Sequence, residues 1–197
     1  MKKAASTRFQ ILEKAFELIY VNGYQATSVD DIIATTQVTK GAFYYHFKNK
    51  DEMGLAVINE VMFPSMEEGF VKSLENSEDP VNDIYAMMKY LLMDDPFLQV
   101  KYGCPAGNLT QEMSPLNDAF SDALSRLVTQ WEDLLKKSLV NGKAAGKIRT
   151  DVNEQRVAYF IMSGYWGIRN FGKLYNSKDC YLSYLEELKI YLSRLAK

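Results

Sequence analysis

The residues with the most distinctive chemistry lie in one segment, residues 39–47, with the sequence TKGAFYYHF. Four of its nine residues are aromatic, and His46 is the only histidine in the 197-residue chain. Lys40, Tyr45 and His46 supply an ammonium, a phenol and an imidazole, and each of these groups can donate hydrogen bonds to phosphate oxygens. The segment is therefore a candidate for contact with the backbone and the base edges of a nucleic acid.

A helix that begins after an N-cap at Thr39 would divide the side chains of this segment between two faces. Phe43 and Phe47 are four residues apart, so they would share one face and fill a small core. Gly41 and Tyr44 would lie toward the exposed side. Glycine costs a helix roughly 1 kcal/mol, which the close approach of another backbone or of a base edge would justify. The alternative is an aromatic core helix with an internally satisfied histidine.

Capping signals around this segment indicate which elements must position it. Ser28, with Asp31 three residues later, predicts a capping box that opens a short helix over residues 29–35. This helix and the one after Thr39 are joined by a turn of only about four residues, which is the layout of a helix-turn-helix. In such a unit the first short helix holds the second one outward, toward a DNA major groove.

Longer helices are expected on both sides of this pair. The first spans about residues 7–22 and ends at Gly23, a typical C-cap residue. The other begins after Asn49 and reaches Phe63, where we expect Pro64 to perturb it. No stretch of the chain alternates apolar and polar residues with period two, so the sequence predicts an all-α protein.

The run GYQATSVDDIIATTQVTKGAFYYHFKNKDEM closely resembles the N-terminal signature of the TetR family of bacterial transcriptional regulators, over about residues 8–58. This resemblance implies a helical homodimer that binds a palindromic double-stranded DNA operator, with a larger C-terminal domain for a small-molecule effector. It also implies base contacts from Lys40, Gly41, Tyr44 and His46, and phosphate contacts from Thr27, Ser28, Thr39, Tyr45 and Lys50. The family usually has glycine in the turn where this chain has Gln37, which must tolerate a positive φ there.

The charge distribution agrees with two functions in one chain, although the net charge is only −2. Residues 1–50 contain seven basic and four acidic residues, and the remainder contains 16 basic and 21 acidic ones. We therefore expect a DNA-binding domain over residues 1–48 and an acidic ligand-binding and dimerisation domain over residues 49–197. A charge excess of this size is also common by chance.

Several protein classes are disfavoured by composition. Two cysteines cannot form a dense disulfide framework, so we expect a reducing, cytoplasmic location. The uncharged run 159–168 is about half of the ~20 residues that a membrane helix needs. No nucleophile–base pair, phosphate loop or metal-ligand cluster stands out, so we expect no catalytic residues, metal or cofactor. An architectural DNA-binding protein without an effector and a helical enzyme with carboxylate chemistry are the alternatives.

The C-terminal part is expected to contain helices over about residues 80–94, 117–140, 151–175 and 178–196, with one short helix in GCPAGNLTQEMSP. That string resembles a motif in a subset of TetR-like regulators, some of which sense electrophiles through a cysteine, so Cys104 is either a sensing thiol or a structural one. Met- and aromatic-rich positions suit an adaptable pocket, but they also suit a plain core. The candidate pocket residues are Met66, Tyr85, Met88, Tyr102, Cys104, Asn108, Glu112, Trp131, Tyr165, Trp166 and Arg169.

Two apolar stripes near the C-terminus predict a dimer interface. They follow helical spacing, so they could pair with their symmetry copies as a four-helix interface. The alternative is that they face the core of their own chain. The residues of these stripes are Val157, Phe160, Ile161, Gly164, Ile168, Tyr181, Leu185, Leu188 and Leu192.

Overall fold

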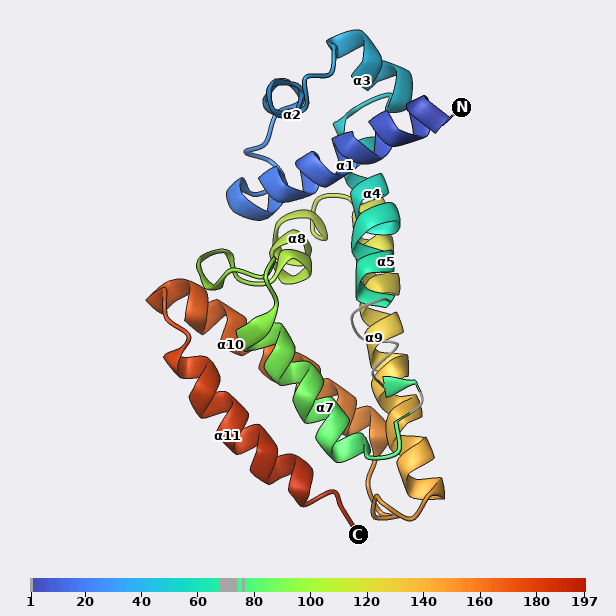
Figure 1. The fold of residues 1–197 in the computed structure, drawn as a ribbon, viewed down its shortest axis with the longest axis vertical. Helices are drawn as coiled ribbons and strands as arrows, with labels where there is room; N and C mark the ends of the chain where they lie inside the picture. The colour runs from blue at the N-terminus through green and yellow to red at the C-terminus, as the bar shows by residue number, and fades with distance from the viewer. Residues whose placement is uncertain (1, 68–73, 76) are drawn as a thin grey trace. The chain divides into compact units, whose positions relative to one another are not determined.

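The computed structural model describes residues 2–67, 74–75 and 77–197, and its ribbon is built from helices (Figure 1). This confirms the all-α prediction. Within these ranges the one β-type pairing is an isolated bridge between Ile148 and Ala196. None of the described helices is both long enough and apolar enough to cross a membrane.

The chain forms two compact units. The first unit combines residues 1–65 with residues 105–127, and the second combines residues 66–104 with residues 128–197. The first unit contains all of the domain expected at residues 1–48. It also includes α8 (Pro105–Met113) and the first part of α9 (Asp118–Ala144), which come from much later in the sequence.

The first unit begins with α1 (Lys2–Asn22), α2 (Val29–Thr36) and α3 (Lys40–His46). α1 starts five residues before the expected Thr7. The predicted caps are confirmed: the Ser28 side chain accepts from the Asp31 amide in a complete capping box, and the Thr39 side chain accepts from the Ala42 amide. Between α2 and α3, Gln37 has φ 55° and ψ 18°, the left-handed conformation that its position in the turn implied.

The next helical stretch continues farther than expected. α4 (Lys50–Val57) is capped by Asn49, as predicted, and runs into a π-helical turn, η1 (Ile58–Met62), followed by α5 (Phe63–Met66). Pro64, which was expected to perturb this helix, lies inside the continuous helical stretch, and the helix changes pitch at η1, directly before Phe63 and Pro64. The core of the unit includes Ile11, Leu12, Ala15, Ile32, Phe43, Phe47 and Met53, each at most 1% exposed.

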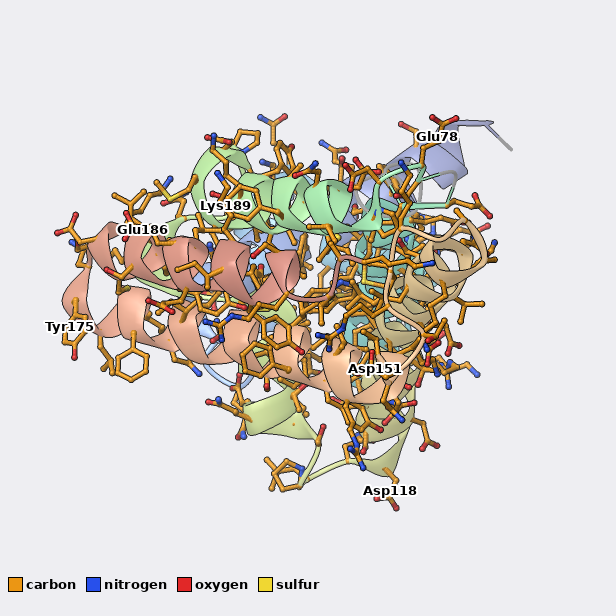
Figure 2. The ribbon with its side chains drawn as sticks, turned by 90° about the horizontal axis from the view of Figure 1, so that it is seen from below. Glu78, Asp118, Asp151, Tyr175, Glu186 and Lys189 are labelled. Carbon is orange, nitrogen blue, oxygen red and sulfur yellow. The ribbon has the colours of Figure 1, made fainter. Side chains whose placement is uncertain are left out.

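The second unit contains α7 (Pro80–Lys89), which is capped by Asp79 and followed by a second π-helical turn, η3 (Tyr90–Asp94). A 3-10 turn, η4 (Val100–Tyr102), precedes the rest of α9. α10 (Glu154–Tyr175) is capped by Asn153, and α11 (Asp179–Ser193) follows it. Figure 2 shows Tyr175 projecting from the end of α10, and its side chain is exposed.

A buried arginine joins the irregular parts of the second unit. Arg169 on α10 is fully buried, and its guanidinium donates to the carbonyls of Leu91, Gln99 and Gly103. π-helical turns and helix ends leave backbone carbonyls without their usual helical partners. A guanidinium has several N–H donors in a fixed planar arrangement that can satisfy such carbonyls. Arg169 therefore ties η3 and η4 to α10.

Candidate nucleic-acid interface

α3 has two chemically different faces, as its sequence predicted. Phe43 is fully buried and Phe47 is 1% exposed, with ring centroids 5.5 Å apart. On the other side, Tyr44 is 48% exposed and Tyr45 is 78% exposed. Two phenylalanines therefore anchor a short helix from which Lys40, Tyr44 and Tyr45 face solvent.

Gly41 lies on this outer side of α3. A Cβ atom built at Gly41 would have no atom within 4 Å apart from its chain neighbours and the adjacent backbone of its own helix. Close packing against another part of the described chain therefore does not require a glycine at this position.

Lys40, the first residue of α3, is paired with a carboxylate. Its Nζ lies 2.9 Å from Oδ1 of Asp30 on α2, and both side chains are mostly exposed. The hydrogen bond to Asp30 raises the pKa of Lys40, so the side chain is a protonated ammonium at neutral pH. An exposed pair of this kind contributes little stability, and the ammonium can exchange partners at little cost.

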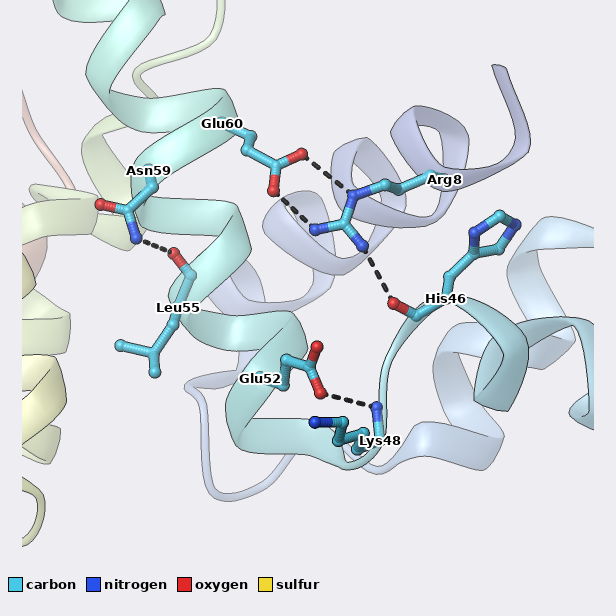
Figure 3. A network of polar contacts seen from close by, with 7 residues as sticks. All are labelled: Arg8, His46, Lys48, Glu52, Leu55, Asn59 and Glu60. Atoms are coloured by element: carbon cyan, nitrogen blue, oxygen red, sulfur yellow. Dashed lines mark hydrogen bonds and ion pairs between the residues drawn. The ribbon is translucent and has the colours of Figure 1, made fainter. Parts of the chain in front are cut away.

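His46 occupies the last position of α3, half-buried between aromatic neighbours. Its ring centroid lies 5.0 Å from that of Tyr45 and 6.3 Å from that of Phe47. Its backbone carbonyl is used by another residue. Arg8 on α1 donates from Nη1 to the carbonyl of His46, at 2.9 Å (Figure 3).

Arg8 is the centre of the network drawn in Figure 3. Its Nε and Nη2 donate to the two carboxylate oxygens of Glu60 in η1, at 3.1 and 2.6 Å. The guanidinium carbon also lies 4.4 Å from the centroid of the Phe47 ring. Arg8 thus connects α1, the end of α3 and η1 through one side chain.

The expected phosphate contacts Thr27, Ser28 and Thr39 are all engaged in local structure. Thr27 is 1% exposed and its hydroxyl donates to the carbonyl of Gly23, so its side chain faces inward. Ser28 and Thr39 are the N-cap residues of α2 and α3. The Ser28 hydroxyl donates to Asp31, whereas the Thr39 hydroxyl accepts from the Ala42 amide, so the Thr39 O–H and the first amides of the two helices can meet a phosphate.

Lys50, also expected at phosphate, lies against the loop between α1 and α2. Its Nζ donates to the carbonyl of Gln25 at 3.3 Å and lies 4.4 Å from the centroid of the Tyr24 ring. Partial burial lowers the pKa of the Lys50 ammonium, and the charges of Asp51 and Glu112 oppose that shift.

The residues expected in a ligand pocket are divided between the two units. Asn108 and Glu112 lie on α8 in the first unit, where Glu112 accepts hydrogen bonds from the α1–α2 loop. The others lie in the second unit, where Met88, Trp131 and Tyr165 are buried, and the last two rings pack edge to face with centroids 5.3 Å apart. The remaining members there are Met66, Tyr85, Tyr102, Cys104, Trp166 and Arg169.

The burial and the bonding of two candidate pocket residues, Arg169 and Cys104, bear on their expected roles. Arg169, expected to line the pocket, is fully buried and donates to the backbone carbonyls of η3 and of the residues beside η4. Cys104 is 8% exposed and is not joined to Cys180 in a disulfide. In the described ranges, no group of three His, Cys, Asp or Glu side chains could hold a metal ion.

Most residues of the expected dimer stripes are buried in their own chain. Phe160 is 49% exposed, whereas Gly164 and Ile168 are half-buried. The buried members, each at most 4% exposed, are Val157, Ile161, Tyr181, Leu185, Leu188 and Leu192. The exposed apolar side chains on the same two helices are Tyr159, Phe160, Phe171, Leu174, Tyr175, Leu182 and Ile190.

Sequence reasoning did not identify the long-range contacts that position the site. Arg8 and Glu60 lie 52 positions apart, and Tyr24 and Glu112 lie 88 apart. No local periodicity links such pairs. The one available signal was Gly23, whose predicted left-handed conformation (φ 91°) is confirmed and marks the place where Glu112 approaches the backbone.

Comparison with known proteins gives matches in both parts of the chain. Residues 11–57 match the family model for bacterial regulatory proteins of the tetR family, and residues 83–187 match the model for a tetracyclin repressor-like C-terminal domain. The transcriptional repressor DhaR of Mycobacterium sp. (strain GP1) is 30% identical over 160 residues, which cover 81% of this chain and 79% of DhaR.

Two further similarities extend over most of the chain. The transcriptional regulator AcuR of Cereibacter sphaeroides is 29% identical over 167 residues, which cover 83% of this chain and 75% of AcuR. The crystal structure of a TetR transcriptional regulator from Chloroflexus aurantiacus superimposes with a TM-score of 0.89 at 25% identity, covering 100% of this chain and 98% of that one.

Proposed function

The chain belongs to the TetR family of transcriptional regulators, and from this we propose that it is a repressor that binds a palindromic operator as a homodimer and is released by a small molecule. It regulates transcription and is not an enzyme. The expected domains, 1–48 for DNA and 49–197 for ligand and dimer contacts, are part of this proposal.

The outer face of α3 is the observation that carries the proposal. Gly41 leaves open space on that face, and Tyr44 and Tyr45 project from it while Phe43 holds the helix from behind. A short helix anchored in this way can lie in the major groove, where side chains at its N-terminal end reach base edges. Lys40, Gly41, Tyr44 and His46 are the proposed base contacts.

The proposed phosphate contacts are of two kinds. Tyr45 and Lys50 would use their side chains, and Lys50 would leave the carbonyl of Gln25 to do so. The caps at Ser28 and Thr39 would present the first amides of α2 and α3, and the backbone of Thr27 adjoins them.

A second copy of the chain is proposed to cover the exposed apolar side chains of α10 and α11. Phe160 and Tyr191 stack with centroids 4.3 Å apart, and Phe171 and Leu174 are 50% and 79% exposed farther along α10. Two half-sites of one operator are read about 34–36 Å apart, which requires two copies of α3. A dimer on this face would also remove large apolar side chains from water.

The proposed effector is a small molecule with a substantial apolar part that binds within the second unit. The interior there combines Met88, Trp131 and Tyr165, and methionine and aromatic side chains adapt to apolar ligands. We propose that Cys104 is structural, because its thiol is buried. A cytoplasmic location, where operator DNA is accessible, is part of the same proposal.

Selection of bound duplexes from a random DNA pool tests DNA recognition directly. We expect a palindromic consensus, and Tyr44→Ala should weaken binding to that duplex by about tenfold without loss of the dimer, since one base contact is worth 1–3 kcal/mol. Tyr90→Ala, which truncates an exposed tyrosine of the second unit, is the matched control. Failure to enrich any sequence would contradict the proposal, and so would equal effects of the two substitutions.

The salt dependence of binding separates phosphate contacts from base contacts. Lys50→Ala should weaken binding to selected and random duplexes alike, and reduce the slope of log K against log salt by about one unit. Lys147→Ala removes an exposed charge from the second unit and should leave the slope unchanged. An unchanged slope in Lys50→Ala would remove this residue from the interface.

A further inference from the structure

The carboxylate of Glu112 on α8 binds the backbone of the α1–α2 loop. Oε2 accepts a hydrogen bond from the amide of Tyr24 at 2.8 Å, and Oε1 accepts one from the amide of Gln25 at 2.7 Å. Each oxygen thus holds one of two consecutive amides. Charge-assisted bonds of this kind are short and stronger than neutral ones.

The loop is shaped to admit this carboxylate. Gly23 has φ 91°, and a Cβ atom on it would lie 3.3 Å from Oε2 and 3.5 Å from Oε1 of Glu112. A side chain at Gly23 would be strained by the backbone and crowded by the carboxylate. The left-handed turn at Gly23 directs the next two amides toward one point, which Glu112 occupies.

The same loop is held from its other side by α4. The Lys50 ammonium binds the carbonyl of Gln25, and the Tyr24 hydroxyl donates to Oδ1 of Asp51 at 2.5 Å. The Tyr24 ring packs edge to face on Phe120 of α9, with centroids 4.9 Å apart. The backbone of Gln25 is therefore held at its amide by the carboxylate of Glu112 and at its carbonyl by the ammonium of Lys50.

The loop leads directly into residues that the proposed function places at DNA. Thr27 bonds back to the carbonyl of Gly23, and Ser28 caps α2. Lys50, which would contact phosphate, rests on the loop itself. A change in loop position therefore alters both the start of α2 and the setting of Lys50.

We propose that Glu112 is a positioning residue for operator binding, acting through its two hydrogen bonds to the α1–α2 loop. This inference rests on the proposed function, because its consequence is measured at the operator. A loop that is not held by Glu112 must be ordered when DNA binds, and that ordering subtracts from affinity. Since Glu112 is carried by α8, the position of α8 becomes a determinant of DNA affinity.

The test compares Glu112→Gln and Glu112→Ala with Asp122→Asn, which removes one exposed charge from the same unit. Glutamine keeps the shape of the side chain but has one acceptor oxygen, so it can satisfy only one of the two amides. We expect amide hydrogen exchange at Tyr24 and Gln25 to be about tenfold faster in both Glu112 variants, and unchanged in Asp122→Asn. This measurement needs no DNA.

The second readout is affinity for the duplex selected by the wild-type protein. We expect about tenfold weaker binding in Glu112→Gln, with an unchanged salt slope, because no phosphate contact is lost. Binding equal to or tighter than wild type would overturn the positioning role, as would unchanged amide exchange. If the wild-type protein selects no DNA, the proposed function fails, and faster exchange at Tyr24 and Gln25 would still locate the Glu112 contact.

Discussion

Arg8 and Glu60 join the first helix to the π-helical turn η1 through two hydrogen bonds of 3.1 and 2.6 Å (Figure 3). The same guanidinium donates to the carbonyl of His46, the last residue of α3. Three elements that are distant in sequence therefore share one planar group. The position of α3 depends on that group as well as on its own phenylalanines.

Arg8→Lys tests this dependence because it retains the positive charge and removes the planar fork of donors. A lysine can replace one of the three hydrogen bonds well, so we expect the free energy of unfolding to fall by about 1 kcal/mol. Operator affinity should fall as well, since the end of α3 is less fixed. Urea titration and DNA titration measure the two effects. Lys14→Ala, which breaks an exposed pair with Glu17, should change neither by more than about 0.5 kcal/mol.

Gly41→Ala should separate stability from function. The added methyl group meets no atom within 4 Å beyond its chain neighbours and the adjacent backbone of α3, and alanine is the better helix former. We therefore expect the free energy of unfolding to rise by about 0.5–1 kcal/mol. Operator affinity should fall, because the methyl group would occupy the space in which the proposed function places a base edge. A variant that is more stable and binds the operator as the wild type does would show that α3 does not approach DNA at Gly41.

Gln37→Gly should stabilise the protein. Gln37 has φ 55°, and this left-handed conformation costs a residue with a side chain about 1–2 kcal/mol. Glycine avoids that cost, but it loses more conformational entropy on folding, which offsets part of the gain. We expect a net gain of about 0.5 kcal/mol in the free energy of unfolding, measured in urea. Asn176, at φ 49°, is the matched control. Because asparagine tolerates this region better, Asn176→Gly should gain less. Equal or opposite changes would contradict the strain at Gln37.

The capping box at the start of α2 should make stability depend on acid. Hydrogen bonds from the hydroxyl and the amide of Ser28 lower the pKa of Asp31 below its usual 3.8. A lowered pKa means that Asp31 contributes stability above its usual pKa and loses that contribution as the pH falls through the lowered value. Asp31→Asn should therefore melt below the wild type at pH 7, and the two melting temperatures should converge once the pH falls below the lowered pKa of Asp31. A constant difference would rule out ionisation of Asp31 as its source.

The features predicted from sequence are those set by residues a few positions apart. Ser28 with Asp31 and the Phe43–Phe47 pair have the structure that their spacing indicated, and Asn49 caps α4 as predicted. Caps and i, i+4 pairs depend only on the local backbone, so they can be predicted without knowledge of the tertiary structure.

The features that the sequence could not give are contacts between distant residues. Glu112, predicted to line a ligand pocket, accepts hydrogen bonds from amides 88 and 87 positions away. Leu185 and Leu188, predicted to lie in a dimer interface, are buried in the single chain, and their role between two copies stays a prediction. An amphipathic pattern identifies the apolar side of a helix, but not the element that covers it. The π-helical turns also have no periodic signature that the sequence could show.

The turn η1 has a consequence for how this chain tolerates changes in length. The amide of Phe63 bonds to the carbonyl of Ile58, so this turn holds one residue more than an α-helical turn. Removing that residue would restore an ordinary helix and rotate every later side chain by about 100° about the helix axis. Glu60 lies inside the turn, and its direction toward Arg8 is tied to this phase. The contact between Arg8 and Glu60 therefore depends on the number of residues between Val57 and Phe63 as well as on the carboxylate of Glu60.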